Sequence, residues 1–224
     1  RTIQAAIDLT NPAGKDIVTV LPGVYDEGKR VSPADWDHEF RIVITNHVVL
    51  RSRDGAHKTI IKGSFGSGAD NLGPGAVRGI YMKDPSYSVV EGFTITGCAT
   101  TNTVASGNMH YGAAVVGSWN QYVLGCVISN NYAVAGAGIY GCNAARSLFT
   151  RNKANSSAVG VNAWYWNCVM ANNIGGSALC YTKKMVNCTC TELDGNIAGG
   201  GNQRFENCVL VGNGGDNGYA SYTA

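Results

Sequence analysis

The sequence predicts an all-β fold, a right-handed parallel β-helix solenoid with a short N-terminal capping helix. Three observations favour it. A short apolar pattern returns in the second half, where Cys168, Cys188 and Cys208 are spaced 20 residues apart. Each copy places a glycine or asparagine beside alternating apolar residues. The chain has 30 glycines in 224 residues, without the three-residue period of collagen. A repeat of this length is typical of one turn of a β-solenoid and too short for paired helices.

The first segment, residues 1–16, is expected to cap the solenoid. The stretch from Thr2 to Leu9 has a helical pattern, with Ile3, Ala6 and Ile7 on one face. An uncapped first coil would expose strand edges and core. A short helix at this end is therefore expected to cover them.

Residues 17–111 are predicted to form irregular coils with inserted loops. Three β-branched runs predict strands: 17–20, 42–44 and 48–50. Gly92 and Phe93 match the later repeat, as a bend and an interior residue. Three polar or glycine-rich stretches are expected to project as loops: 26–41, 63–78 and 98–111. Such insertions in a solenoid often carry function.

Residues 112–224 are predicted to form regular coils of about 20–24 residues, within a single domain that spans 1–224. One repeat position holds mostly glycine and asparagine, the residues that best tolerate a left-handed backbone. This position therefore indicates a tight bend. This bend column holds Gly92, Gly125, Ser147, Asn167, Asn187 and Asn207. The next position forms an interior column of Phe93, Cys126, Leu148, Cys168, Cys188 and Cys208. A second interior column follows two residues later, at Ile128, Thr150, Met170, Cys190 and Leu210.

Composition excludes several classes of protein. Hydrophobic residues make up 45% of the chain and charged residues 14%, which argues against disorder. The net charge of +2 gives no electrostatic case for a nucleic-acid partner. No apolar run approaches the roughly 20 residues of a membrane-spanning helix. The abrupt start and end of the pattern suggest a fragment of a longer protein.

Several segments resemble known β-helices. Residues 2–8 and 17–25 are similar to the cap and first coil of the pectate-lyase-like superfamily, and 90–97 to a strand motif of that group. Residues 136–139 and 149–152 resemble the paired GGxI and FxxN signatures of polymorphic outer-membrane-type bacterial surface proteins. The resemblance implies the fold and an extracellular or bacterial cell-surface location. It is weak for activity, because this fold serves lyases, hydrolases, epimerases, adhesins and structural proteins.

The densest polar cluster is the loop Asp35, Trp36, Asp37, His38 and Glu39. Its carboxylates are of the type that ligates calcium, which is the one cofactor that this composition suggests. Trp36 is of the type that stacks on sugars. The same composition also suits an ordinary exposed loop. Trp166 is the candidate exposed aromatic for carbohydrate binding, although aromatic residues also pack inside solenoids. The eight cysteines are interpreted as buried thiols rather than zinc ligands.

Two function classes follow. The favoured one is a secreted or cell-surface structural and adhesive scaffold that binds glycans or associates with itself through the solenoid ends. The alternative is a polysaccharide lyase acting on uronate-containing glycans, which would need calcium-binding carboxylates beside a basic residue. The sequence does not place three acidic residues at one column of adjacent coils. This favours the scaffold over the lyase.

Overall fold

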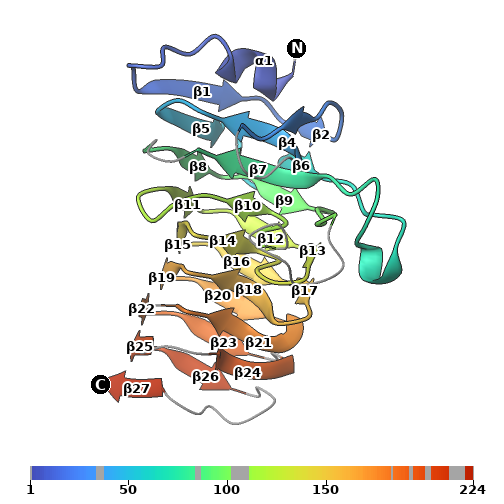
Figure 1. Cartoon of the computed structure of the whole chain (residues 1–224). Coiled ribbons are helices and arrows are strands. Elements are labelled where there is room, and N and C mark those ends of the chain that lie inside the picture. The colour runs from blue at the N-terminus through green and yellow to red at the C-terminus, as the bar shows by residue number, and fades with distance from the viewer. Residues whose placement is uncertain are drawn as a thin grey trace.

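The chain winds into stacked coils whose strands form three parallel sheets (Figure 1). A computed structural model describes residues 2–33, 38–83, 87–101, 111–182, 184–191, 194–199, 203–211 and 220–223. Each coil contributes strands to the sheets in turn, and equivalent strands of successive coils pair in parallel. The predicted β-helix is therefore confirmed.

The first sheet, called sheet A, runs nearly the whole length of the solenoid. Its strands, in spatial order, are β1 (Asp16–Val20), β5 (Val48–Ser52), β8 (Val89–Glu91), β11 (Tyr122–Leu124), β15 (Asn143–Ala145), β19 (Trp164–Trp166), β22 (Lys184–Val186), β25 (Gln203–Glu206) and β27 (Ala220–Thr223).

Sheet B follows sheet A in each coil. Its strands are β2 (Gly23–Tyr25), β6 (Thr59–Lys62), β9 (Thr94–Thr96), β12 (Val127–Ser129), β16 (Leu148–Thr150), β20 (Val169–Ala171), β23 (Thr189–Thr191) and β26 (Val209–Val211).

Sheet C closes the coil and is less regular. Its strands are β3 (Arg30–Val31), β4 (Glu39–Ile44), β7 (Arg78–Met82), β10 (Val115–Val116), β14 (Ile139–Tyr140), β18 (Ser157–Val161), β21 (Ile174–Cys180), β17 (Lys153–Ala154) and β13 (Tyr132–Ala133), with β24 (Asp194–Gly199) beside β21. The pair β3–β4 is antiparallel, so part of the predicted loop 26–41 forms a hairpin instead.

A short helix, α1 (Ile3–Ile7), covers the N-terminal end as expected. The hydroxyl of Thr2 caps it by accepting from the Ala5 amide at 3.2 Å. Ile3 and Ile7 are buried against the first coils, whereas Ala6 is exposed and does not share their face. No helix in the described part of the chain is long and apolar enough to span a membrane.

The excursion 63–78 leaves the coil between sheets B and C, as expected of an inserted loop (Figure 1). An antiparallel bridge between Ser64 and Val77 closes its base, and a short 3₁₀ helix, η1 (Ala69–Asn71), lies near its tip. It folds back onto later coils, where Phe65 packs on Tyr132 and Asp70 pairs with Lys153 at 2.7 Å. Of the third predicted loop, residues 102–110 lie outside the described residues.

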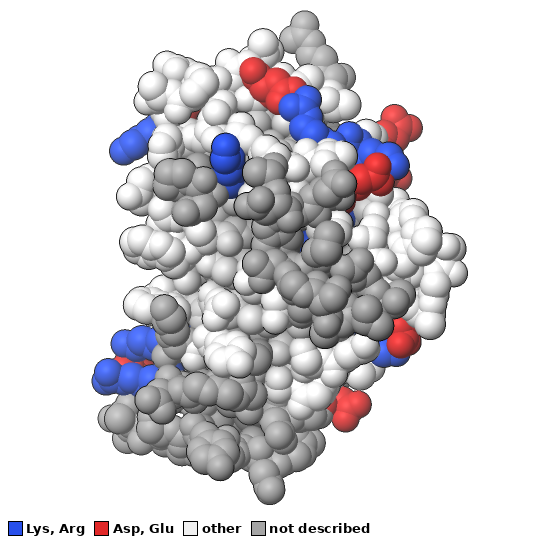
Figure 2. All heavy atoms as spheres, viewed as in Figure 1, with Lys and Arg blue, Asp and Glu red and all other residues white. Residues whose placement is uncertain are grey.

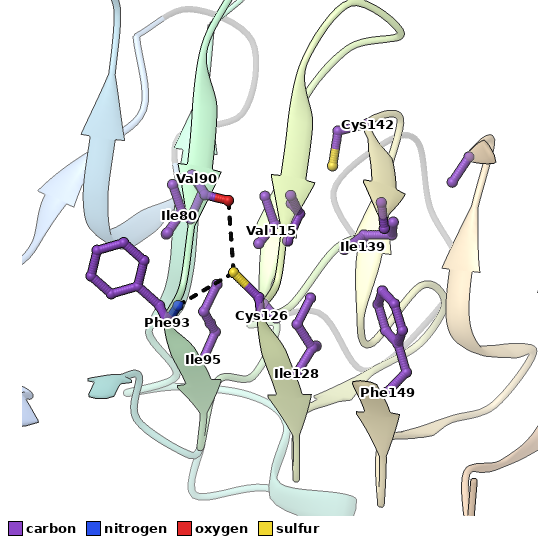
Figure 3. Close-up of a cluster of buried hydrophobic side chains, with 14 of the residues drawn as sticks. Ile80, Val90, Phe93, Ile95, Val115, Cys126, Ile128, Ile139, Cys142 and Phe149 are labelled. Carbon is purple, nitrogen blue, oxygen red and sulfur yellow. Dashed lines mark hydrogen bonds between the residues drawn. The ribbon is translucent and has the colours of Figure 1, made fainter. Parts of the chain in front are cut away.

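Among the described residues on the face in Figure 2, charged side chains gather near the N-terminal end and at the level of β22 and β25. Surface ion pairs contribute little individually, whereas the buried apolar interior runs through the coils. Side chains alternate along each strand, so every second residue points inward. Figure 3 shows Ile95, Ile128 and Phe149 side by side in one interior row, with Cys126 directed between Val90 and Phe93.

The bend between sheets A and B uses the left-handed backbone that the sequence pattern indicates. Its φ angles are 76° at Gly92, 57° at Gly125, 52° at Asn167, 53° at Asn187 and 50° at Asn207. The interior residues that follow these bends are buried at Phe93, Cys126, Cys168 and Cys188. Cys208 is only half-buried, and β26 is the last strand of sheet B in the part of the chain that the structure describes.

The predicted alignment of residues 145–150 is wrong by one position. Leu148 pairs with Val127 and is half-buried, so it does not belong to the interior column. Phe149 points inward in place of Thr150, Ser147 stacks on Cys126, and Arg146 takes the bend with φ 52°. Because a one-residue shift exchanges the two faces of a strand, the choice is decided by which register buries the large Phe149 ring.

A ladder of buried asparagines stabilises the turn after sheet B. Asn131, Asn152 and Asn173 stack on successive coils with at most 1% of each exposed. Asn152 Oδ1 accepts from the Asn131 amide at 3.2 Å and from its side chain at 3.0 Å, and Asn152 Nδ2 donates to Ile128 O at 2.9 Å. The ladder was not predicted from the sequence. Its one sequence signal is the 21-residue spacing of the three asparagines, each of which follows a residue with positive φ in the structure.

Candidate functional site

A shallow groove lies on the outer face of sheet A, at its border with sheet B. It has a volume of about 380 Å³ and is lined by Tyr122, Leu124, Ala145, Arg146, Trp166 and Asn167. These residues come from three consecutive coils, at the ends of β11, β15 and β19. The predicted candidate Trp166 is therefore part of a groove that crosses neighbouring coils.

The groove exists because a small residue stands between two large ones. Leu124, Ala145 and Trp166 occupy the same outward column, one coil apart. Successive coils are about 4.8 Å apart, so the Leu124 and Trp166 side chains flank a gap roughly two coil spacings wide above the Ala145 methyl group. A flat ligand of that width would lie over Ala145, against the Trp166 side chain.

Aromatic side chains lie in and beside the groove on the exposed face. Tyr122 is 37% exposed and Trp164 is 39% exposed. The Trp164 and Trp166 ring centroids lie 5.7 Å apart with planes inclined at 59°. Between them in sequence, Tyr165 points inward and is fully buried. The period-2 alternation of β19 therefore puts both indoles on the outer face, where their apolar surfaces are available to a ligand.

Asn143 orders the upper part of this face. It lies between Tyr122 and Trp164 in the outward column, yet it is only 5% exposed. Its Nδ2 donates to Trp119 O at 2.5 Å, and its Oδ1 accepts from the Trp164 amide at 3.2 Å. These bonds fix the backbone that carries Trp164 relative to the preceding coil. Asn143 carries no signal in the sequence pattern, and only the stacking of coils reveals its position.

Ionic groups at the two ends of sheet A are paired with each other. Arg51 bonds Glu91 at 2.7 Å above the groove. Below it, Glu206 accepts from Lys184 at 2.9 Å and from Arg204 at 2.7 Å. The hydrogen bond from Lys184 is the main cause that lowers the pKa of the Glu206 carboxyl. Arg146 differs, because its exposed side chain has no ion-pair partner among the described residues.

The structure describes only part of the predicted loop 35–39. Asp35, Trp36 and Asp37 lie outside the described residues. His38 is 5% exposed, with Nδ1 3.3 Å from the Thr101 hydroxyl, and Glu39 bonds Lys29 at 2.7 Å. His38 is therefore a buried side chain rather than part of an open surface loop, and Glu39 already has a cationic partner. Among the described residues, no three His, Cys, Asp or Glu side chains are placed to hold a metal ion.

A second hollow, of about 490 Å³, lies between α1 and the start of sheet C, with Arg41 in its lining. The Arg41 guanidinium donates to Lys62 O at 2.8 Å, to Ser64 Oγ at 3.1 Å and to Gly28 O. Burial lowers its pKa. The basic residues at the rim are also engaged, since Lys29 bonds Glu39 and Arg30 bonds Asp8. Its polar groups mainly tie the capping helix and hairpin to the solenoid.

The cysteines whose side chains are described are thiols, and all but Cys208 are buried, as interpreted from the sequence. Desolvation raises the pKa of Cys98 and Cys142 to about 12 and that of Cys126 to about 11, from an ordinary 9.0. These groups are small apolar fillers of the core rather than reactive nucleophiles.

This burial predicts an alkaline loss of stability. Above about pH 9 the unfolded thiols ionise while the folded thiols stay protonated up to about pH 11 or 12, so unfolding is favoured as pH rises through that window. Below pH 9 both states are protonated and the thiols contribute no slope. Urea unfolding at a series of pH values should show the decline, and Cys142→Ala should show a shallower one. Equal slopes in the two proteins would contradict the assignment.

No family model matches the chain, and no curated protein shows significant similarity to it.

Proposed function

We propose that the chain is a secreted or cell-surface β-helix scaffold that binds glycans in the groove on sheet A. The observation that carries the proposal is the aromatic surface of Tyr122, Trp164 and Trp166 beside the gap over Ala145. Sugar rings present apolar C–H faces that pack against exposed aromatic rings, while their hydroxyls need polar partners at the rim. Arg146 and Asn167 supply such partners in the same groove.

A rigid solenoid suits this role. The groove residues sit at strand ends whose backbones are fixed by hydrogen bonds to the coils on both sides, such as Arg146 N to Trp166 O at 2.9 Å and Gly125 N to Ala145 O at 3.0 Å. A site built on paired strands loses little conformational entropy when a ligand binds. The groove residues come from three consecutive coils, which suits contact with one segment of an extended polymer.

Replacing Trp166 with alanine tests the proposal. Binding of the intact chain to a panel of neutral, uronate-containing and sulfated polysaccharides is measured by affinity electrophoresis and by tryptophan fluorescence. We expect at least one polysaccharide to bind, and Trp166→Ala to weaken that binding at least about tenfold, as for a central aromatic contact. Trp119→Ala is the matched control, because Trp119 is 75% exposed and outside the groove lining.

Two results would overturn the proposal. One is the absence of binding to every polysaccharide, and the other is equal loss of binding in the Trp166 and Trp119 variants. The same panel is incubated with calcium and followed by ultraviolet absorbance. Unsaturated uronate product would identify the chain as the alternative polysaccharide lyase rather than a binding scaffold.

A further inference from the structure

We infer that the groove selects glycans that carry an anionic group, a carboxylate or a sulfate ester, and that Arg146 contacts this group. The inference rests on the proposed function and adds the chemical class of the ligand. It is carried by the backbone conformation of Arg146, by the absence of a partner for its side chain among the described residues and by its place in the groove.

The backbone at Arg146 is unfavourable for an arginine. Its φ is 52°, in the left-handed region where residues with a Cβ are disfavoured and where glycine and asparagine are the usual choices. At the same bend, neighbouring coils have Gly125 and Asn167 with nearly the same φ. An arginine in this column is less favourable for the coil than those residues, so backbone preference does not explain its place in the bend.

The guanidinium of Arg146 has no structural task among the described residues. The side chain is exposed and forms no ion pair or hydrogen bond with the part of the chain that the structure describes. The arginines elsewhere on sheet A do have partners, since Arg51 bonds Glu91 and Arg204 bonds Glu206. The five donors of Arg146 are therefore available to a ligand.

The groove around Arg146 is complementary to an anion. None of the six described residues that line it is acidic. A sugar packed over Ala145 against Trp166 would bring a ring substituent towards Arg146, whose planar guanidinium matches a carboxylate or sulfate with two parallel hydrogen bonds. Asn167 lies in the next bend, where its Oδ1 accepts from Asn187 at 3.2 Å. Its own NH₂ group provides a further donor at the rim.

Backbone strain by itself does not identify a site, and Arg151 shows why. Arg151 follows β16 in the same coil with φ 55°, and it is equally exposed, but it lies at the opposite edge of sheet B and lines neither hollow. What distinguishes Arg146 is the aromatic groove. Arg151 is therefore the matched control for the same residue type, the same backbone conformation and the same coil.

The test compares Arg146→Asn with Arg151→Asn. Both replace an arginine with the residue that other coils use at the bend, so both should fold and keep or raise the thermal midpoint. The ligands are a polyuronate, its carboxyl-reduced neutral derivative and a sulfated galactan. We expect Arg146→Asn to bind at least about tenfold more weakly to the polyuronate, the sulfated galactan or both, with no change for the neutral derivative. Arg151→Asn should match the wild type throughout.

The three ligands distinguish a carboxylate ligand from a sulfate ligand. A loss confined to the polyuronate identifies a carboxylate ligand, and a loss confined to the sulfated galactan identifies a sulfate ligand. Unchanged anionic binding in Arg146→Asn, or an equal loss in Arg151→Asn, would overturn the inference. If Trp166→Ala abolishes binding while Arg146→Asn does not, the glycan groove stands and only its anionic selectivity fails. If no polysaccharide binds the wild type, the proposed function itself fails and the selectivity with it.

Discussion

Replacement of Phe149 with alanine is expected to lower the free energy of unfolding by about 4 kcal/mol, among the largest effects of any single substitution in this chain. The ring is fully buried in the interior row of sheet B, between Ile128 and Met170. It also packs edge-on against Tyr165 with centroids 5.6 Å apart. Its removal leaves a cavity that the hydrogen-bonded coils on either side cannot close.

Leu148→Ala is the control for this prediction, because it tests the register of the strand. Leu148 is adjacent in sequence but points outward and is half-buried, so its truncation should cost about 1 kcal/mol or less. Urea unfolding followed by circular dichroism measures both variants. Comparable losses would contradict the assigned register, and a larger loss for Leu148→Ala would show that residue 148 rather than 149 faces the interior.

Asn152→Ala should destabilise the chain by about 3 kcal/mol, although it removes only a small polar side chain. Without Oδ1 the buried Asn131 amide loses an acceptor, and without Nδ2 the Ile128 carbonyl loses a donor. Unsatisfied buried groups are costly because water cannot replace the lost partner. The effect therefore comes from the neighbours that are left unpaired.

Asn155→Ala provides the comparison, since Asn155 is in the same coil but exposed. Its unfolding free energy should stay within about 0.5 kcal/mol of the wild type. Amide hydrogen exchange adds a local readout, because the amide of Asn131 should lose protection in Asn152→Ala and keep it in Asn155→Ala. Retained protection together with wild-type stability would show that the ladder contributes little.

The sequence determined the fold class and much of the regular half of the solenoid. The 20-residue spacing of Cys168, Cys188 and Cys208 and the asparagines before them predicted coils with left-handed bends, and the structure has those bends. A pattern of this kind is readable because each bend needs a residue that tolerates positive φ, and few residue types do. The pattern of Thr2 to Leu9 similarly predicted the capping helix.

Only the tertiary structure decided the register of residues 145–150 and the location of the groove. Alternation along a three-residue strand is compatible with two alignments one residue apart, and contacts with the coils above and below select the one that buries Phe149. That register places Ala145 between Leu124 and Trp166 in the outward column, and it places Arg146 in the bend. The groove thus arises from side chains about 20 residues apart in sequence, whose sizes matter only once the coils are stacked.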